Sequence, residues 1–268
     1  MAEILYHHKK IFYRKSGSGP VVVLLHGFGE TGEVWNRQVE ELQKHHTLII
    51  PDLPGSGNSY RLDDGAGIDD YADAINTIMN QEAGGAKFHL FGHSMGGYTT
   101  MAFVEKFSDR LQTFGLVHSS AFADTKEKVE IRQKGIEFIR DHGGQKFLKS
   151  LATNLFSEES LEKNPELVNE LVVQARDIDD STLIQYYQAM IHRPDRSGLL
   201  SSAHVPVFFL IGKYDPVVPY DVALKQCHLP DISSVTVLEH SGHLGIWEEA
   251  DIATDSMVNF LNNFGQPK

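Results

Sequence analysis

The stretch Phe88-His89-Leu90-Phe91-Gly92-His93-Ser94-Met95-Gly96-Gly97 joins a short apolar run to a segment of helical character that continues to about Lys106. Its centre, Gly92-His93-Ser94-Met95-Gly96, follows the pattern G-x-S-x-G. A sharp turn between a strand and a helix holds such a serine hydroxyl clear of the sheet, and the flanking glycines leave room for the crowded backbone. The stretch therefore predicts that the Ser94 hydroxyl stands clear of the sheet at the N-terminal end of a helix, where free N–H groups favour negative charge.

Short apolar runs alternate with helical patterns on both sides of this motif. The predicted strands are 10–15, 21–25, 47–50, 88–91, 111–117, 205–211 and 234–238. Between them, apolar residues recur at helical spacing, as in Ile68, Ala72, Ile75 and Met79. Wholly apolar strands that alternate with amphipathic helices are typical of a parallel sheet covered on both faces. The sequence therefore predicts an α/β protein with a mostly parallel central sheet flanked by helices.

The alternation stops over residues 124–194, where only helical patterns occur. Val129, Ile136 and Ile139 mark one helix, and Leu183 and Met190 lie on the apolar face of another. The strand pattern then returns at 205–211. This order predicts a helical segment inserted into one α/β core rather than two consecutive domains.

Composition excludes several classes of protein. The 24 Lys and Arg residues against 36 Asp and Glu residues give a net charge of −12, which argues against a nucleic-acid partner. No apolar run approaches the roughly 18 residues that span a bilayer, and residues 1–10 lack the pattern of a signal peptide. The single cysteine, Cys227, cannot form an intrachain disulfide. We therefore expect a cytoplasmic protein with no membrane association, and we find no metal-binding motif.

The motif at Ser94 and the order of the strands resemble the α/β-hydrolase superfamily over about residues 10–264. The resemblance implies that Ser94 is the nucleophile. It places the acid after a later strand, where Asp215 follows 205–211, and the base after the last strand, where His243 stands in His240-Ser241-Gly242-His243. In such a triad the base takes the serine proton, and the acid fixes the imidazole tautomer and stabilises its charged form.

The same resemblance implies an oxyanion hole made of two backbone N–H groups. One would belong to Met95, directly after the nucleophile. The other would belong to Phe28, in the loop His26-Gly27-Phe28-Gly29 after an early strand. We expect His26 to shape this loop by hydrogen bonding.

Other residues compete for the triad positions. His240 is three residues from His243, and Asp221 and Asp109 are alternatives to Asp215. We expect His93, beside the nucleophile, to pack or form hydrogen bonds rather than act on substrate. The loop around Asp52 resembles the family's D-x-x-G-x-G-x-S loop and is expected to frame the entrance to the site.

In the superfamily an all-helical insertion at this point is a lid over the catalytic serine. The resemblance therefore implies a core of residues 1–120 and 203–268 and a lid of residues 121–202. Aromatic residues of the lid, and a histidine after strand 111–117, are the candidates to line a substrate pocket: His118, Phe122, Phe138, Phe156 and Tyr187.

The stretch from Tyr187 to Arg196 is similar to the 3-oxoadipate enol-lactonase-like branch of the superfamily. This similarity implies a serine hydrolase, in the carboxylesterase and lactonase class, that cleaves small to medium carboxylic esters or lactones through an acyl-enzyme on Ser94. The chemistry requires no cofactor. Two alternatives stay open: a carbon–carbon bond hydrolase of ring-cleavage diketones with the same triad, and a ligand receptor on a hydrolase scaffold.

Overall fold

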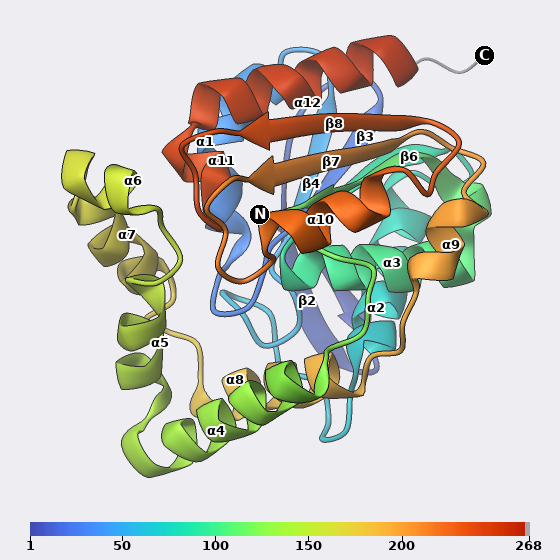
Figure 1. Cartoon of the computed structure of the whole chain (residues 1–268). Helices are drawn as coiled ribbons and strands as arrows, with labels where there is room; N and C mark the ends of the chain where they lie inside the picture. The colour runs from blue at the N-terminus through green and yellow to red at the C-terminus, as the bar shows by residue number, and fades with distance from the viewer. Residues whose placement is uncertain (266–268) are drawn as a thin grey trace.

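A computed structural model describes residues 1–265 and places one eight-stranded sheet at the centre of the molecule (Figure 1). The strand order is β1-β2-β4-β3-β5-β6-β7-β8. The strands are β1 (Ala2–Tyr6), β2 (Lys9–Gly17), β3 (Val21–Leu25), β4 (Thr47–Pro51), β5 (Phe88–His93), β6 (Leu111–Val117), β7 (Val207–Gly212) and β8 (Ser233–Leu238). The predicted mostly parallel sheet is confirmed, because every pair from β4 through β8 is parallel.

Strand β1 was not predicted from the sequence. It pairs antiparallel with β2 from Ala2 opposite Tyr13 to Tyr6 opposite Lys9. The two residues between the strands, His7 and His8, have φ angles of 47° and 63°. Two consecutive positive φ angles are those of a tight hairpin turn, which normally uses Asn or Gly and is therefore not signalled by two histidines.

Helices cover both faces of the sheet, as Figure 1 shows with α12 and α1 on one side and α2, α3 and α10 on the other. Their bounds are α1 (Asn36–Leu42), α2 (Ile68–Glu82), α3 (Met95–Phe107), α10 (Tyr220–Cys227), α11 (Gly245–Glu248) and α12 (Ala250–Phe264), with short 3-10 helices η1 (Gly32–Trp35) and η2 (Ser108–Arg110). Each face has its own apolar core. Ile75 and Phe103 lie in one core, and Trp35, Phe208 and Phe260 lie in the other.

Six helices lie between β6 and β7 in the chain. They are α4 (Lys126–His142), α5 (Gly144–Ala152), α6 (Glu158–Lys163), α7 (Glu166–Gln174), α8 (Asp180–His192) and α9 (Ser197–Ser201). In Figure 1, α5, α6 and α7 lie on the side toward which the arrowheads of β7 and β8 point. The inserted helices are thus near the carboxyl ends of the parallel strands, where α/β proteins bind their ligands. None of the helices within residues 1–265 is long and apolar enough to cross a bilayer.

The turn from β5 into α3 depends on two glycines. A Cβ atom on Gly92 would lie 2.2 Å from the backbone carbon of Gly96, and a Cβ atom on Gly96 would lie 2.5 Å from the carbonyl oxygen of Leu25. Both obstacles are backbone atoms, which cannot move aside as a flexible side chain would. Helix α3 can therefore pack directly against the end of β3 only when both positions lack a side chain.

We expect Gly92→Ala to lower the free energy of unfolding by about 3 kcal/mol, since the added methyl group overpacks a rigid backbone contact. Gly198→Ala is the matched control, because Gly198 is exposed in α9 and nothing lies within 4 Å of the added atom. That variant should be unchanged or more stable by up to about 1 kcal/mol. Urea unfolding of both variants checks this, and equal stabilities would contradict the packing argument.

Candidate active site

Ser94 occupies a strained backbone position at the end of β5. Its φ and ψ angles are 50° and −116°, and the next residue, Met95, is the first of helix α3. Its amide donates to the Val117 carbonyl at 3.0 Å, and its carbonyl accepts hydrogen bonds from the Gly97 amide and the Ser119 hydroxyl. A positive φ costs a serine about 1–3 kcal/mol, so the neighbouring strand and helix hold it in place.

Asp215 follows β7 and receives four N–H groups. Its Oδ2 lies 2.8 Å from Nδ1 of His243 and 3.3 Å from Nδ1 of His118, and its Oδ1 accepts from the amides of Val217 and Val218 at 2.8 and 2.9 Å. Burial opposes the charged carboxylate, but electrostatic attraction and hydrogen bonds from the His243 and His118 rings outweigh it and hold the pKa of Asp215 well below its usual range. The carboxylate is therefore ionised and fully satisfied.

His118 is a second imidazole on the same carboxylate. It is wholly buried, and burial, only partly offset by Asp215, lowers its pKa to about 4. The ring is therefore neutral near pH 7 and donates from Nδ1, while its Nε2 has no hydrogen-bond partner among the described residues. Ligand atoms of His118, Asp215 and His243 lie within 4.8 Å of one another, so a metal ion could bind there only by replacing these hydrogen bonds.

The competing triad candidates lie elsewhere. His240 is exposed and pairs with Glu159 on α6 at 2.8 Å. Asp221 is exposed and faces Lys225 on α10, and Asp109 is an exposed residue of η2. Of the candidates, only His243 and Asp215 are both buried and hydrogen-bonded to each other.

The loop after β3 is closed by its own side chains. Glu30 accepts the Gly27 amide at 2.6 Å, and His26 bridges to the Asp52 loop by accepting the Leu53 amide at 2.8 Å on Nε2. Because Nε2 accepts, Nδ1 of His26 carries the proton toward the Gly27 carbonyl, and burial lowers the pKa of this ring. Phe28 lies in this loop, and its ring stacks on Tyr187 of α8 with 4.3 Å between the ring centres.

A small cavity of about 70 Å³ brings the core and the inserted helices together. Ser94, His243 and Phe28 line it from the core, and Arg132, Tyr187 and others line it from the insertion. The complete lining is Phe28, Glu30, Ser94, Tyr98, Arg132, Leu151, Leu155, Tyr187, Met190, Val217 and His243. The amide of His243 also donates to the Leu155 carbonyl at 2.7 Å, which ties the segment after α5 to the candidate base.

The family model for the alpha/beta hydrolase fold matches residues 20–250. This chain belongs to the alpha/beta hydrolase fold family. The match confirms the predicted fold and the prediction that the protein is a hydrolase.

Two curated relatives align over nearly the whole hydrolase. A pimeloyl acyl-carrier protein methyl ester esterase from Vibrio cholerae is 24% identical over 255 residues, which cover 93% of this chain and 97% of that protein. A 2-hydroxy-6-oxononadienedioate/2-hydroxy-6-oxononatrienedioate hydrolase from Escherichia coli is 24% identical over 276 residues, which cover 94% of this chain and 91% of that protein.

Solved structures are similar over the same extent. A thermophilic esterase from Thermogutta terrifontis, with malate bound, has a TM-score of 0.91 at 27% identity and covers 96% of this chain and 95% of its own. The enol-lactonase from Burkholderia xenovorans has a TM-score of 0.89 at 20% identity and covers 97% of this chain and 100% of its own, which shows a common fold.

The predicted pocket residues of the hydrolase separate into two groups. Tyr187 lines the cavity. His118 does not line it, but it forms a hydrogen bond with Asp215. Phe122, Phe138 and Phe156 do not line this cavity. The buried face of α4 carries Gly135, Ile136 and Ile139, and Arg132 lies one turn before them. Phe138 lies on a different face of the helix and is exposed. Phe156 instead packs beside Trp247, and Phe122 is half-buried with its carbonyl bound by Arg193.

Sequence reasoning did not predict Tyr98, Arg132, Leu151, Met190 or Val217 in this cavity. A signal for Arg132 was present, because it falls between Val129 and Ile136 at helical spacing and is thus a cation on an apolar stripe. No comparable signal distinguishes Tyr98 or Val217 from ordinary core residues.

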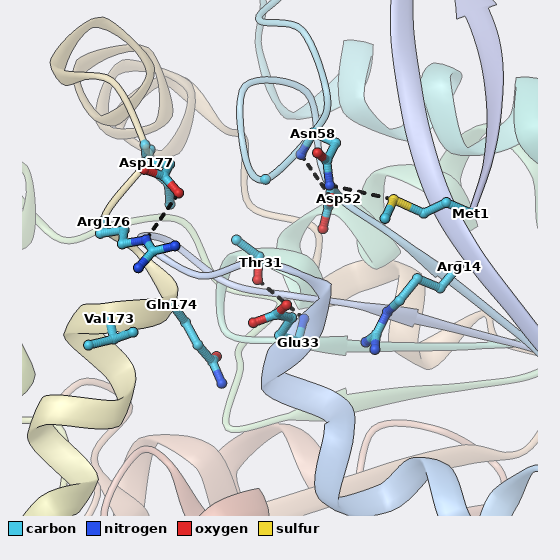
Figure 2. Close-up of a pocket in the computed structure, with 12 residues that line it drawn as sticks. Met1, Arg14, Thr31, Glu33, Asp52, Asn58, Val173, Gln174, Arg176 and Asp177 are labelled. Atoms are coloured by element: carbon cyan, nitrogen blue, oxygen red, sulfur yellow. Dashed lines mark hydrogen bonds and ion pairs between the residues drawn. The ribbon is translucent and has the colours of Figure 1, made fainter.

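A second cavity, of about 280 Å³, lies outside the candidate site (Figure 2). Arg14, Glu33 and Asp52 line it from the core, and Arg176 and Asp177 line it from the segment after α7. Asp52 accepts the amides of Gly32 and Asn58, both at 3.0 Å, and so closes its own loop. These contacts hold the Asp52 loop together, and Asp52 does not line the cavity that contains Ser94.

His93 connects the loop after β3 to the candidate base. Its Nδ1 lies 3.0 Å from Glu30 Oε2, and its Nε2 lies 3.0 Å from the carbonyl oxygen of His243. The pKa of Glu30 is lowered, so its carboxylate, like the His243 carbonyl, accepts hydrogen bonds only; both ring nitrogens then donate, and the ring is an imidazolium. Burial alone would lower its pKa, but the charge and hydrogen bond of Glu30 raise it above the ordinary value. Burial opposes the Glu30 carboxylate as well, and the charge of His93 still lowers the pKa of Glu30.

This buried ion pair predicts a pH-dependent contribution to stability. Because the pKa of His93 is raised in the folded protein, its charged ring stabilises the fold fully below about pH 6.5. This stabilisation is lost as the pH rises through the pKa of His93 in the folded state. A lowered pKa at Glu30 means that its contribution is complete above the ordinary 4.5 and is lost as the pH falls through its folded value. We expect His93→Gln to lose about 3 kcal/mol at pH 6, because Glu30 is left as an unpaired buried charge.

The difference in unfolding free energy between wild type and His93→Gln should narrow as the pH rises above the pKa of His93. Other titratable groups face this ring, namely His26, His118, His243 and Asp215, and they are present in both proteins. The double variant Glu30→Gln/His93→Gln is the control and should recover much of the loss. A difference that does not change between pH 6 and 10 would refute the imidazolium.

Proposed function

We propose that this hydrolase cleaves small to medium carboxylic esters or lactones through an acyl-enzyme on Ser94. The observation that carries the proposal is the combination of Ser94 on a strained turn with a buried His243–Asp215 pair, 2.8 Å apart, where Ser94 and His243 line one cavity. The esterase relatives and the enol-lactonase structure support the same class of reaction.

In the proposed reaction His243 takes the proton of the Ser94 hydroxyl as the oxygen attacks the carbonyl carbon. Nδ1 of His243 is engaged by Asp215, which leaves Nε2 for this proton. The tetrahedral oxyanion would accept hydrogen bonds from the amides of Met95 and Phe28. Collapse expels the alcohol, which takes the proton from His243, and leaves the acyl group on Ser94. Water then attacks the acyl-enzyme while His243 takes its proton. His243 returns that proton to Ser94 as the carboxylic acid leaves.

The size of the cavity favours short substrates. A volume of about 70 Å³ admits a group of a few heavy atoms, and the apolar residues Leu151, Leu155 and Met190 suit a short acyl or alkyl chain. We propose that residues 121–202 act as the lid, since α4, α5 and α8 contribute side chains to the cavity beside Ser94. Location in the cytoplasm remains part of the proposal and rests on the single cysteine.

Ser94→Ala should reduce hydrolysis of p-nitrophenyl acetate by at least about 10⁴-fold with an unchanged melting curve, because removal of a triad member removes the whole nucleophilic path. Asp215→Asn and His243→Gln should be similarly impaired. His240→Gln and Asp221→Asn are matched controls on exposed residues and should keep wild-type rates.

A fluorophosphonate probe should label wild type once, at Ser94, and should not label Ser94→Ala. Wild-type activity in Ser94→Ala would overturn the proposal. Rapid turnover of a ring-cleavage diketone with no ester hydrolysis would instead assign the carbon–carbon reaction. A single slow turnover followed by ligand-dependent binding of a partner would assign a receptor.

A further inference from the structure

The cavity beside Ser94 contains a cation from the inserted helices. Arg132 lies on α4, and its side chain is 13% exposed. Its Nε donates to Asp124 Oδ2 at 2.6 Å, and its Nη2 lies 3.3 Å from Asp124 Oδ1. Its Nη1 makes no hydrogen bond to any residue of the described chain, although Arg132 lines the cavity. One donor edge of a mostly buried guanidinium is therefore without a protein acceptor.

The charges around Asp124 do not balance. Arg193 also reaches its carboxylate, with Nη2 at 2.9 Å from Oδ1, so two guanidinium groups share one carboxylate. Arg193 is otherwise satisfied, because it donates to the carbonyls of Met190 and Phe122 and lies 3.7 Å over the ring of Tyr98. The excess positive charge is thus left on Arg132, the member of the pair that lines the cavity.

The other charged groups nearby do not pair with Arg132. Asp195 feels the charge of Arg193, which lowers its pKa, but it is exposed and forms no ion pair with either arginine in the described part of the chain. Glu30 lines the same cavity, but its charge is matched by the His93 imidazolium. Asp215 does not line the cavity, and its oxygens are covered by four N–H donors. A buried cation with a free donor edge favours an anionic ligand, and a planar guanidinium is well suited to a carboxylate.

We propose that Arg132 binds a carboxylate of the substrate, so that the preferred substrates are short esters or lactones that carry a free carboxylate. This inference rests on the proposed hydrolysis at Ser94 and adds the class of substrate. Because the cavity is small, the carboxylate and the scissile carbonyl must be only a few bonds apart. The carboxylate could belong to the acyl part or to the alcohol part, and the experiment separates the two.

The test compares matched pairs of esters. Monomethyl succinate carries the carboxylate on the acyl side, and methyl 4-oxopentanoate is its neutral counterpart; acetoxyacetate carries it on the alcohol side, and acetoxyacetone is its neutral counterpart. We expect wild type to prefer at least one acid over its neutral counterpart in kcat/KM. Arg132→Gln should lower kcat/KM for that acid by at least about tenfold more than kcat/KM for its neutral counterpart, mainly through KM.

Arg140→Gln is the matched control, because Arg140 is an exposed arginine of the same helix, and it should keep the preference. Arg132→Lys should retain part of it, since it keeps the charge but not the planar fork. No preference for either acid in wild type, or an equal loss on acid and neutral esters in Arg132→Gln with an unchanged melting temperature, would overturn the inference.

Binding separates this inference from the proposed reaction. Succinate or acetoxyacetate should raise the melting temperature of Ser94→Ala but not of Ser94→Ala/Arg132→Gln. If that shift is seen while wild type hydrolyses no ester, the carboxylate site stands and the proposed reaction fails. If wild type hydrolyses p-nitrophenyl acetate through Ser94 but neither acid shifts the Ser94→Ala variant, the reaction stands and the carboxylate site fails.

Discussion

The close approach of backbone to backbone at the turn between β5 and α3 determines how the rest of the molecule is arranged. Gly92 meets Gly96, and Gly96 meets the end of β3, without any side chain between them. Ser94 lies between these two glycines with a positive φ, and the first turn of α3 lies beside the backbone at the end of β3. The nucleophile and the two amides proposed for the oxyanion hole are therefore placed by one packing constraint.

Buried charges connect this turn to the other strand ends. Asp215 is held by two imidazoles and two amides, and the His93–Glu30 pair joins the loop after β3 to the backbone of His243. Such groups are costly to bury unless each is paired, and these are paired within the core. Arg132 is the exception, because it shares its counter-ion with Arg193 and keeps a free edge. The inserted helices thus contribute to the cavity a positively charged side chain with a free donor edge.

The strongly patterned parts of the chain were predictable. The apolar runs located seven of the strands, and the order of Ser94, Asp215 and His243 along the chain matched a known arrangement of strand ends. Strand β1 was missed because only Ile4 of its five residues is buried, so it contains no apolar run, and because its hairpin turn is made by His7 and His8, which carry no turn signal. Phe138 and Phe156 were assigned to the cavity by residue type, whereas their orientation depends on how α4 and the segment after α5 pack.

The sequence by itself determined the α/β-hydrolase fold, the inserted helices and the three triad candidates, because periodicity, glycine spacing and chain order are local or sequential properties. Only the tertiary structure decided that His118 joins His243 on Asp215, that His93 is charged, and that Arg132 lines the cavity beside Ser94. Those outcomes depend on distances between residues far apart in the chain, on burial and on the number of acceptors around each donor. None of these is set until the helices pack against the sheet.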